Sequence, residues 1–104
     1  MWFCMNDGFI SAVVHRDDAS LLCVRARRKK DIESIFPGKE IILKKNADYK
    51  YRVVISKEEF SKIILDRIMN INYDNFKNSV PDNDLHELYG KFWSQHYMYQ
   101  HTEN

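Results

Sequence analysis

The sequence has few of the residues that form ligand-binding loops, and it has no excess of charge of either sign. Its 104 residues include only three glycines and two prolines, and 16 Lys and Arg residues nearly balance 15 Asp and Glu residues, for a net charge of +1. Three glycines provide no glycine-rich loop for a phosphate, and no serine lies in a nucleophile-elbow pattern. A molecule with this net charge has no strong field to attract a polyanion.

Long apolar runs are also absent, and cysteine is rare. No run approaches the roughly 18 apolar residues that a transmembrane helix needs, and the first residues show no targeting pattern. We therefore expect a cytoplasmic protein without membrane contact. Cys4 and Cys23 lie in apolar runs without a Cys-x-x-Cys motif, which is typical of buried free thiols in a reducing compartment. A Cys4–Cys23 disulfide is the alternative, because the sequence does not fix the distance between them.

The residues that are present suffice for one domain over residues 1–100, followed by a tail at 101–104 that should fray. Apolar runs and period-two alternation predict about five strands, over residues 2–5, 9–15, 21–27, 40–44 and 49–55. The turn signal Asn6-Asp7-Gly8 joins the first two strands into a hairpin.

Helical patterns follow the strands. A short helix is expected over residues 29–36, and Ser56 with Glu59 forms a capping box for a longer one. A helical turn over 73–80 and a last helix from 83 to about 100 complete the chain. The expected core stripes are Phe60, Ile63, Ile64, Ile68 and Ile71 in the longer helix, and Leu85, Leu88, Phe92 and Tyr99 in the last one. This order favours an α+β fold, with a mostly antiparallel sheet of about five strands and two to four helices packed mainly on one face.

Short motifs spread over nearly the whole chain carry a resemblance. They are Met1-Trp2, Gly8-Phe9-Ile10-Ser11-Ala12-Val13-Val14, Val24-Arg25-Ala26-Arg27, Asp48-Tyr49-Lys50-Tyr51-Arg52, Tyr73-Asp74-Asn75-Phe76-Lys77, and Tyr89 with Trp93. In this order they make the chain similar to a family of short bacterial and phage-encoded proteins. The resemblance implies a bacterial or phage cytosolic origin and a self-contained domain, and it implies no activity, ligand or catalytic residue. It also singles out polar residues that a core does not need, which are Arg25, Arg27, Arg52, Asp74, Asn75 and Lys77.

Basic residues gather in and beside the expected strands. The candidates for binding a nucleic acid or another anion are Arg25, Arg27, Arg28, Lys44, Lys50 and Arg52. If the strands pair as expected, the arginines project from the face opposite the helices, where they could hold a phosphate backbone. The alternative is a solvated surface, which is the usual place for Lys and Arg. Tyr49 and Tyr51 are expected on the other face, so this surface lacks the aromatic pair of an RNA-recognition sheet.

Asp74, Asn75 and Lys77 are candidates for a small polar site beside Tyr73 and Phe76. The alternative is a cap and turn, because Asp and Asn side chains bond to nearby backbone groups while the aromatic residue packs. The sequence leaves both interpretations open.

No catalytic or metal-binding set emerges. His86, His96 and His101 are ten and five residues apart, whereas metal ligands on one helix face need a spacing of three or four. Cys23 with His15 is the remaining nucleophile–base pair, and no third orienting residue accompanies it. We therefore expect no enzyme activity, no metal and no cofactor.

The last helix ends in large side chains. They cannot all face one core, because successive helical residues diverge by about 100°. Trp93, Tyr97, Met98 and Tyr99 are therefore candidates for a protein interface, which would serve self-association or a partner. The alternative is that this helix lies between other elements of the same chain.

Two function classes follow from these observations. The first is a small non-enzymatic binding module that engages a protein, either a second copy of itself or a bacterial or phage machine. The second is a nucleic-acid-binding domain that uses Arg25, Arg27 and Arg52. A small enzyme without a recognisable catalytic set is a distant third.

Overall fold

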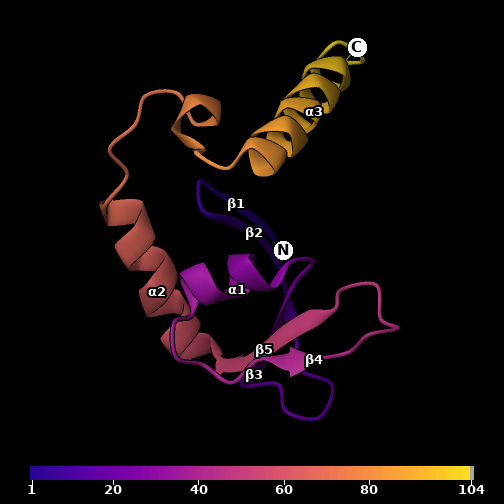
Figure 1. The fold of residues 1–104 in the computed structure, drawn as a ribbon, viewed down its shortest axis with the longest axis vertical. Helices are drawn as coiled ribbons and strands as arrows, with labels where there is room; N and C mark the ends of the chain where they lie inside the picture. Colours follow the sequence, from indigo (N-terminus) through magenta and orange to yellow (C-terminus); the bar gives the residue numbers. More distant parts are fainter. Residues whose placement is uncertain (104) are drawn as a thin grey trace.

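The computed structural model describes residues 1–103, which form a five-stranded antiparallel sheet with three α-helices and one 3₁₀ turn (Figure 1). The strand order across the sheet is β1-β2-β3-β5-β4. The elements are β1 Trp2–Met5, β2 Gly8–Val14, β3 Leu21–Ala26, α1 Lys29–Ile35, β4 Ile42–Leu43, β5 Tyr51–Ser56, α2 Lys57–Met69, η1 Lys77–Ser79 and α3 Asn83–Gln100. The predicted α+β class and mostly antiparallel sheet are confirmed.

Side chains of one face of the sheet form the larger core with α1 and α2. Alternate residues of the three central strands point into this core. Among them, Ile10, Val24 and Val53 are at most 1% exposed. Ile32 of α1 and Phe60 of α2 pack on this face and cover the core on its helical side. The face is dry because period-two alternation places only apolar residues of β2, β3 and β5 on it.

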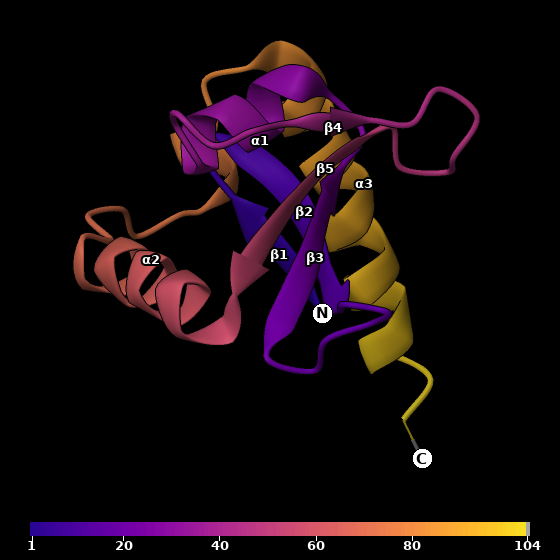
Figure 2. The same ribbon diagram turned by 90° about the horizontal axis from the view of Figure 1, so that it is seen from below.

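The opposite face meets α3. Phe9 of β2 packs edge-on against Phe92, and both belong to a second, smaller apolar cluster with Leu85 and Tyr89 of α3. Figure 2 shows α2 and α3 on opposite sides of the strands. Two of the three α-helices therefore share one face, and the third covers one end of the other.

Both longer helices are capped by the side chain that precedes them, at Ser56 as predicted and at Asp82 as the structure adds. The Ser56 hydroxyl accepts a hydrogen bond from the backbone N–H of Glu59 at 3.0 Å, and an Asp82 carboxylate oxygen accepts one from Leu85 N at 2.9 Å. Each cap satisfies a backbone donor that the first helical turn leaves without a partner.

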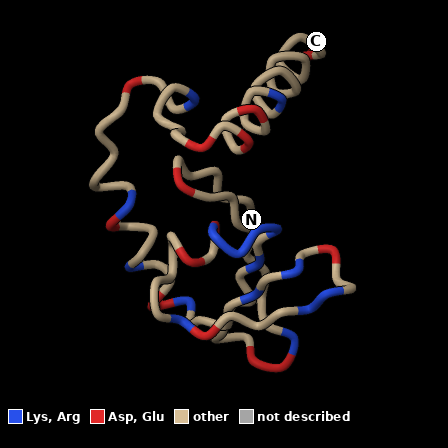
Figure 3. The backbone as a smooth tube through the Cα atoms, viewed as in Figure 1, with Lys and Arg blue, Asp and Glu red and all other residues tan. Residues whose placement is uncertain are grey.

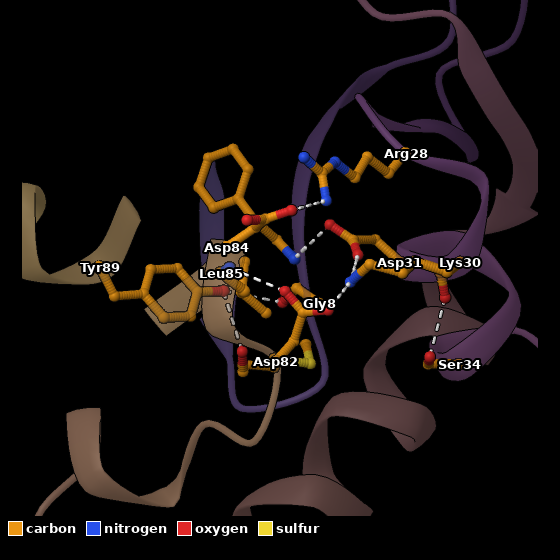
Figure 4. A network of polar contacts seen from close by, with 11 residues as sticks. Gly8, Arg28, Lys30, Asp31, Ser34, Asp82, Asp84, Leu85 and Tyr89 are labelled. Atoms are coloured by element: carbon orange, nitrogen blue, oxygen red, sulfur yellow. Dashed lines mark hydrogen bonds and ion pairs between the residues drawn. The ribbon is translucent and has the colours of Figure 1, made fainter. Parts of the chain in front are cut away.

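A network of buried polar contacts fixes α3 and α1 to the hairpin of β1 and β2 (Figure 4). The Tyr89 hydroxyl lies 2.9 Å from the Met5 carbonyl and 3.0 Å from the Gly8 carbonyl. On the α1 side, the buried Asp31 carboxylate accepts from Phe9 N at 3.2 Å. A Cβ at Gly8 would lie 3.0 Å from the Asp31 carbonyl oxygen, so a larger residue would force the backbone of α1 to shift by a few tenths of an ångström.

Several details differ from the predictions. Tyr49 precedes β5 and packs in the α3 cluster, so it does not share the face of Tyr51. The predicted core stripes end early, because Ile68 is 56% and Tyr99 is 81% exposed. Tyr89, buried at 2%, takes the core position expected of Leu88. The last turn of α3 is exposed, whereas the last turn of α2 turns Ile68 outward and contacts the β1–β2 turn through the Arg67–Asp7 ion pair.

The cysteines and the tail complete the comparison with the sequence. Cys4 and Cys23 are both free, as predicted, but neither is fully buried: Cys4 is exposed on the edge strand β1, and Cys23 is half-buried. His101 and Thr102 continue the last helix with backbone hydrogen bonds, and Asn104, part of the tail expected to fray, lies outside the described residues. No helix within residues 1–103 has the length and apolar character to span a membrane.

Candidate functional site

The predicted basic residues separate into three groups. Arg25 of β3 lies directly opposite Arg52 of β5 in the antiparallel register, with Ser11 of β2 on its other side. These three residues form a row across the face of the sheet that α1 and α2 leave uncovered. Arg25 Nη2 donates to Ser11 Oγ at 3.0 Å.

Tyr49 contacts both arginines of this row. Its ring is 4% exposed and lies 4.5 Å from the Arg25 guanidinium carbon and 4.2 Å from that of Arg27. Its backbone carbonyl accepts from Arg52 Nε at 3.4 Å. The prediction that Tyr49 faces away from the arginines is therefore wrong. Because the ring is buried under two guanidinium groups, it stabilises them by cation–π contact and presents no free surface for a base to stack on.

Three of the neighbouring basic residues are paired with carboxylates. Arg27 donates to Asp48 at 2.9 Å, and Arg28 donates to Asp84 at 3.0 Å. The hydrogen bond to Asp48 raises the pKa of Arg27, and the same contact lowers the pKa of Asp48. Lys30 lies between Asp31 and Asp82. Figure 3 shows acidic positions at the start of α3 and basic positions at the start of α1, the two segments that the Arg28–Asp84 and Lys30–Asp82 ion pairs join.

The remaining two predicted basic residues lie at the edge. Lys44 and Lys50 are exposed at the two ends of the loop between β4 and β5, where Lys44 N donates to the Lys50 carbonyl at 2.8 Å. Within residues 1–103 neither forms an ion pair. The structure therefore does not join all six predicted residues into one basic surface.

The predicted polar segment lies beside the aromatic part of α3. A cleft of about 390 Å³ is lined by Asp74, Asn75 and Lys77 on one wall and by Phe92, Trp93 and His96 on the other. Lys77 Nζ lies 4.7 Å from the centre of the Trp93 ring. Asn75 also accepts from Asn78 N at 3.1 Å, which is the turn contact that its alternative interpretation predicts. The predicted polar residues and Trp93, a member of the predicted interface, thus meet in one cleft.

Beyond this cleft, α3 and its C-terminal end carry a series of aromatic rings in contact with one another. Trp93 and Tyr97 stack with centroids 5.5 Å apart and planes 18° from parallel, and the His101 ring lies 4.3 Å from Tyr97. We call Trp93, Tyr97 and His101 the aromatic ladder. Residues one turn apart face the same way on a helix, so the ladder occupies one continuous stripe.

Every residue from 93 to 100 is exposed, and in Figure 1 this half of α3 leads away from the sheet. Trp93 is 52%, Tyr97 is 49% and Met98 is 59% exposed. The alternative of a helix sandwiched within its own chain therefore does not describe this half of α3.

The histidine and cysteine candidates are not brought together. His15 Nδ1 accepts from Asp17 N at 3.1 Å, and the Cys23 thiol accepts a weak contact from Arg52 Nη1 at 3.9 Å. Among residues 1–103, no group of three His, Cys, Asp or Glu side chains has metal-binding geometry.

Sequence reasoning missed two residues that organise these sites. Tyr49 holds the arginine row, and Tyr89 fixes the first half of α3 to the β1–β2 hairpin. Burial raises the pKa of Tyr89, which keeps its hydroxyl proton available as a donor. Both tyrosines belong to motifs that carry the family resemblance, and that was the available signal.

Comparisons with known proteins add no identification: no family model matches the sequence, and neither the curated proteins nor the solved structures contain a match. The resemblance to short bacterial and phage proteins stays a prediction, and the function is argued from the geometry.

Proposed function

We propose that this chain is a small non-enzymatic binding module that engages a protein through the projecting half of α3, residues 93–100. One observation carries the proposal: all eight residues are exposed, although they include Trp93, Tyr97, Met98 and Tyr99. Tryptophan, tyrosine and methionine are enriched in the centres of protein interfaces, where they contribute a large part of the binding energy. A cytoplasmic location and a bacterial or phage origin belong to the same proposal.

The aromatic ladder suits recognition because it is already ordered. Stacking of Trp93 on Tyr97, and the Lys77 ammonium over the Trp93 ring, restrict the rotamers of these side chains. A surface ordered before binding loses less side-chain entropy when a partner covers it. An amphipathic helix laid into an apolar groove is a common form of such recognition.

The chain offers such a groove on its own surface, which favours a second copy as the partner. The groove has a volume of about 610 Å³ and lies between α2 and the β1–β2 hairpin, with Leu22, Phe60 and Leu65 among its lining residues. It lies on the face opposite α3, so a chain cannot fill its own groove with its projecting helix. A net charge of +1 opposes association of two copies only weakly.

Nucleic-acid binding by the whole basic surface receives less support. Arg27, Arg28 and Lys30 are already paired with carboxylates, and Tyr49 is buried beneath the arginines. A single strand would have to displace these ion pairs, and the ring of Tyr49 is not exposed for a base to stack on.

Light scattering over a concentration series tests the proposal. We expect the mass to rise from monomer to dimer between about 1 μM and 1 mM, the range of weak specific interfaces. The variant Trp93→Ala/Tyr97→Ala should remain monomeric. Ile71→Ala is the matched control, because Ile71 is 53% exposed and lies outside the groove, and it should associate like the wild type. A wild-type chain that stays monomeric over the whole range contradicts a second copy as the partner.

A further inference from the structure

The guanidinium groups of Arg25 and Arg52 form no ion pair with a carboxylate among the described residues. Within residues 1–103, neither guanidinium has an acidic partner within ion-pair distance, whereas Arg27, Arg28 and Arg67 each have one. Asp48 influences Arg25 through space, but its carboxylate is held by Arg27. Both arginines are only partly exposed, so water screens their charges incompletely.

These two charges face each other across neighbouring strands. Side chains directly opposite in an antiparallel pair have Cβ atoms about 4.5–5.5 Å apart, and like charges in that position are destabilising. The contacts of Tyr49 and Ser11 hold the pair in place despite this repulsion. An arrangement that costs stability and is held by its surroundings is typical of a functional site.

The pair still has donors to offer. Arg25 Nη1 and Arg52 Nη2 make no hydrogen bond within residues 1–103. Among the described residues that are not themselves exposed, Arg25 Nε is the only fully buried side-chain nitrogen or oxygen without a partner, so these two terminal nitrogens each keep some surface accessible to solvent. The sheet around them is also open, since Val13 is 38% and Val54 is 36% exposed, and the rings of α3 pack at the Phe9 end of the face.

We propose that Arg25 and Arg52, facing each other across β3 and β5, form a binding site for a phosphate group. Two guanidinium groups offer a charge of +2, which matches a phosphate dianion, whereas one arginine already matches a carboxylate. The phosphate would lie between the two terminal nitrogens and relieve the repulsion between the guanidiniums. A free phosphate ion or a terminal phosphate reaches this charge, whereas a phosphodiester of a nucleic-acid strand carries a single negative charge and would use the same hydrogen-bond donors with one charge left over.

The test is a titration followed by the Nε–Hε resonances of the arginines in NMR spectra, with inorganic phosphate as the probe and chloride at matched ionic strength as the reference. Two charge-assisted hydrogen bonds correspond to a Kd on the order of 1 mM. We expect phosphate, and not chloride, to shift the Arg25 and Arg52 signals saturably. Arg52→Gln should weaken binding at least about tenfold, while the control Arg28→Gln, which removes a paired arginine, should leave Kd unchanged.

Further arms decide between sources of the anion. Acetate that binds as tightly as phosphate would overturn the proposal, because the site would then not distinguish a phosphate from a carboxylate. An oligothymidylate without terminal phosphate that shifts the same signals, and loses its affinity in Arg52→Gln, would support the site and assign the phosphate to a single strand. The charge-conserving variant Arg25→Lys/Arg52→Lys keeps the fold and the +2 charge, and it should bind phosphate more weakly than the wild type. The absence of a saturable shift in the wild-type chain would overturn the proposal.

Discussion

One face of the sheet is closed by apolar packing against α1 and α2, whereas the other is closed at one end by aromatic rings and left open at the other around two arginines. On the first face, Ile10 and Ile32 are fully buried, and no charged side chain belongs to the core cluster. On the second face, Arg25 and Arg52 share the open end with exposed valines. Apolar packing therefore stabilises the first face, whereas the second face combines apolar packing at one end with two like charges that oppose stability at the other.

The first face should respond most strongly to substitution. Ile32→Ala removes a fully buried side chain from the core and should lower the free energy of unfolding by about 2–5 kcal/mol. Ile68→Ala on α2 is the control, because Ile68 is 56% exposed, and its change should stay within about 0.5 kcal/mol. Denaturant unfolding followed by circular dichroism measures both values. Equal losses for the two variants would contradict the assignment of the core.

On the second face, Tyr89→Phe should have the next largest effect. It removes the hydroxyl that bonds to the Met5 and Gly8 carbonyls and should cost about 1–3 kcal/mol, because these carbonyls are then left without that donor. Tyr97→Phe removes a hydroxyl from the exposed half of α3 and should be neutral. Hydrogen exchange of α3 amides should rise in Tyr89→Phe alone, and unchanged protection would show that α3 is held in another way.

These two regions also differ in what the sequence reveals. Apolar periodicity predicts the strands and helices of the first face well. The apolar residues that recur along the sequence are the same residues that pack in the core. The alternation pattern predicts the wrong face for Tyr49, because it extends the strand to a residue that precedes β5, which begins at Tyr51. The side chain of a residue just before a strand is directed by loop contacts, here with Arg25 and Arg27, and period two does not describe them.

The exposed half of α3 illustrates the same limit. A helical stripe predicts which residues share a face, but it does not say whether a sheet continues beneath them. Leu85 and Tyr89 pack against the sheet in the cluster with Phe9. Tyr99 is exposed, since the helix is longer than the face it covers. The contact of Lys77 with Trp93 depends on tertiary structure in the same way, so each residue could be proposed as a candidate from the sequence but their contact could not.

Acid should weaken the carboxylate contacts that border the second face. Leu85 N lowers the pKa of Asp82, and Arg27 lowers that of Asp48, from an ordinary value of 3.8. Because the folded pKa values lie below the unfolded ones, this stabilisation is complete above pH 3.8 and is lost as the pH falls through the folded values. Unfolding free energies measured from neutral pH downwards should decrease in that window.

The variant Asp82→Asn sharpens this pH prediction. Its side chain can still cap α3 but no longer titrates, so the decrease in acid should be smaller than in the wild type. A wild-type stability that stays constant or rises as the pH falls below 3.8 would contradict the role of these carboxylates.

The smallest effect concerns the arginine row. Sodium chloride screens the repulsion between Arg25 and Arg52, so added salt should stabilise the wild type by a few tenths of a kcal/mol more than it stabilises Arg52→Gln. Thermal unfolding at low and high salt measures the difference. An identical salt response in both proteins would show that the two guanidiniums do not repel each other measurably.

The most direct test of the proposed interaction surface mixes two variants. Trp93→Ala/Tyr97→Ala removes the aromatic ladder, and Leu65→Asp, at a residue that is 59% exposed, places a charge in the apolar groove. If the ladder of one chain enters the groove of another, each variant alone should sediment as a monomer, and the mixture should form a dimer through its one intact contact. A mixture that stays monomeric under conditions where the wild type dimerises, or variants that each dimerise like the wild type, would contradict the account.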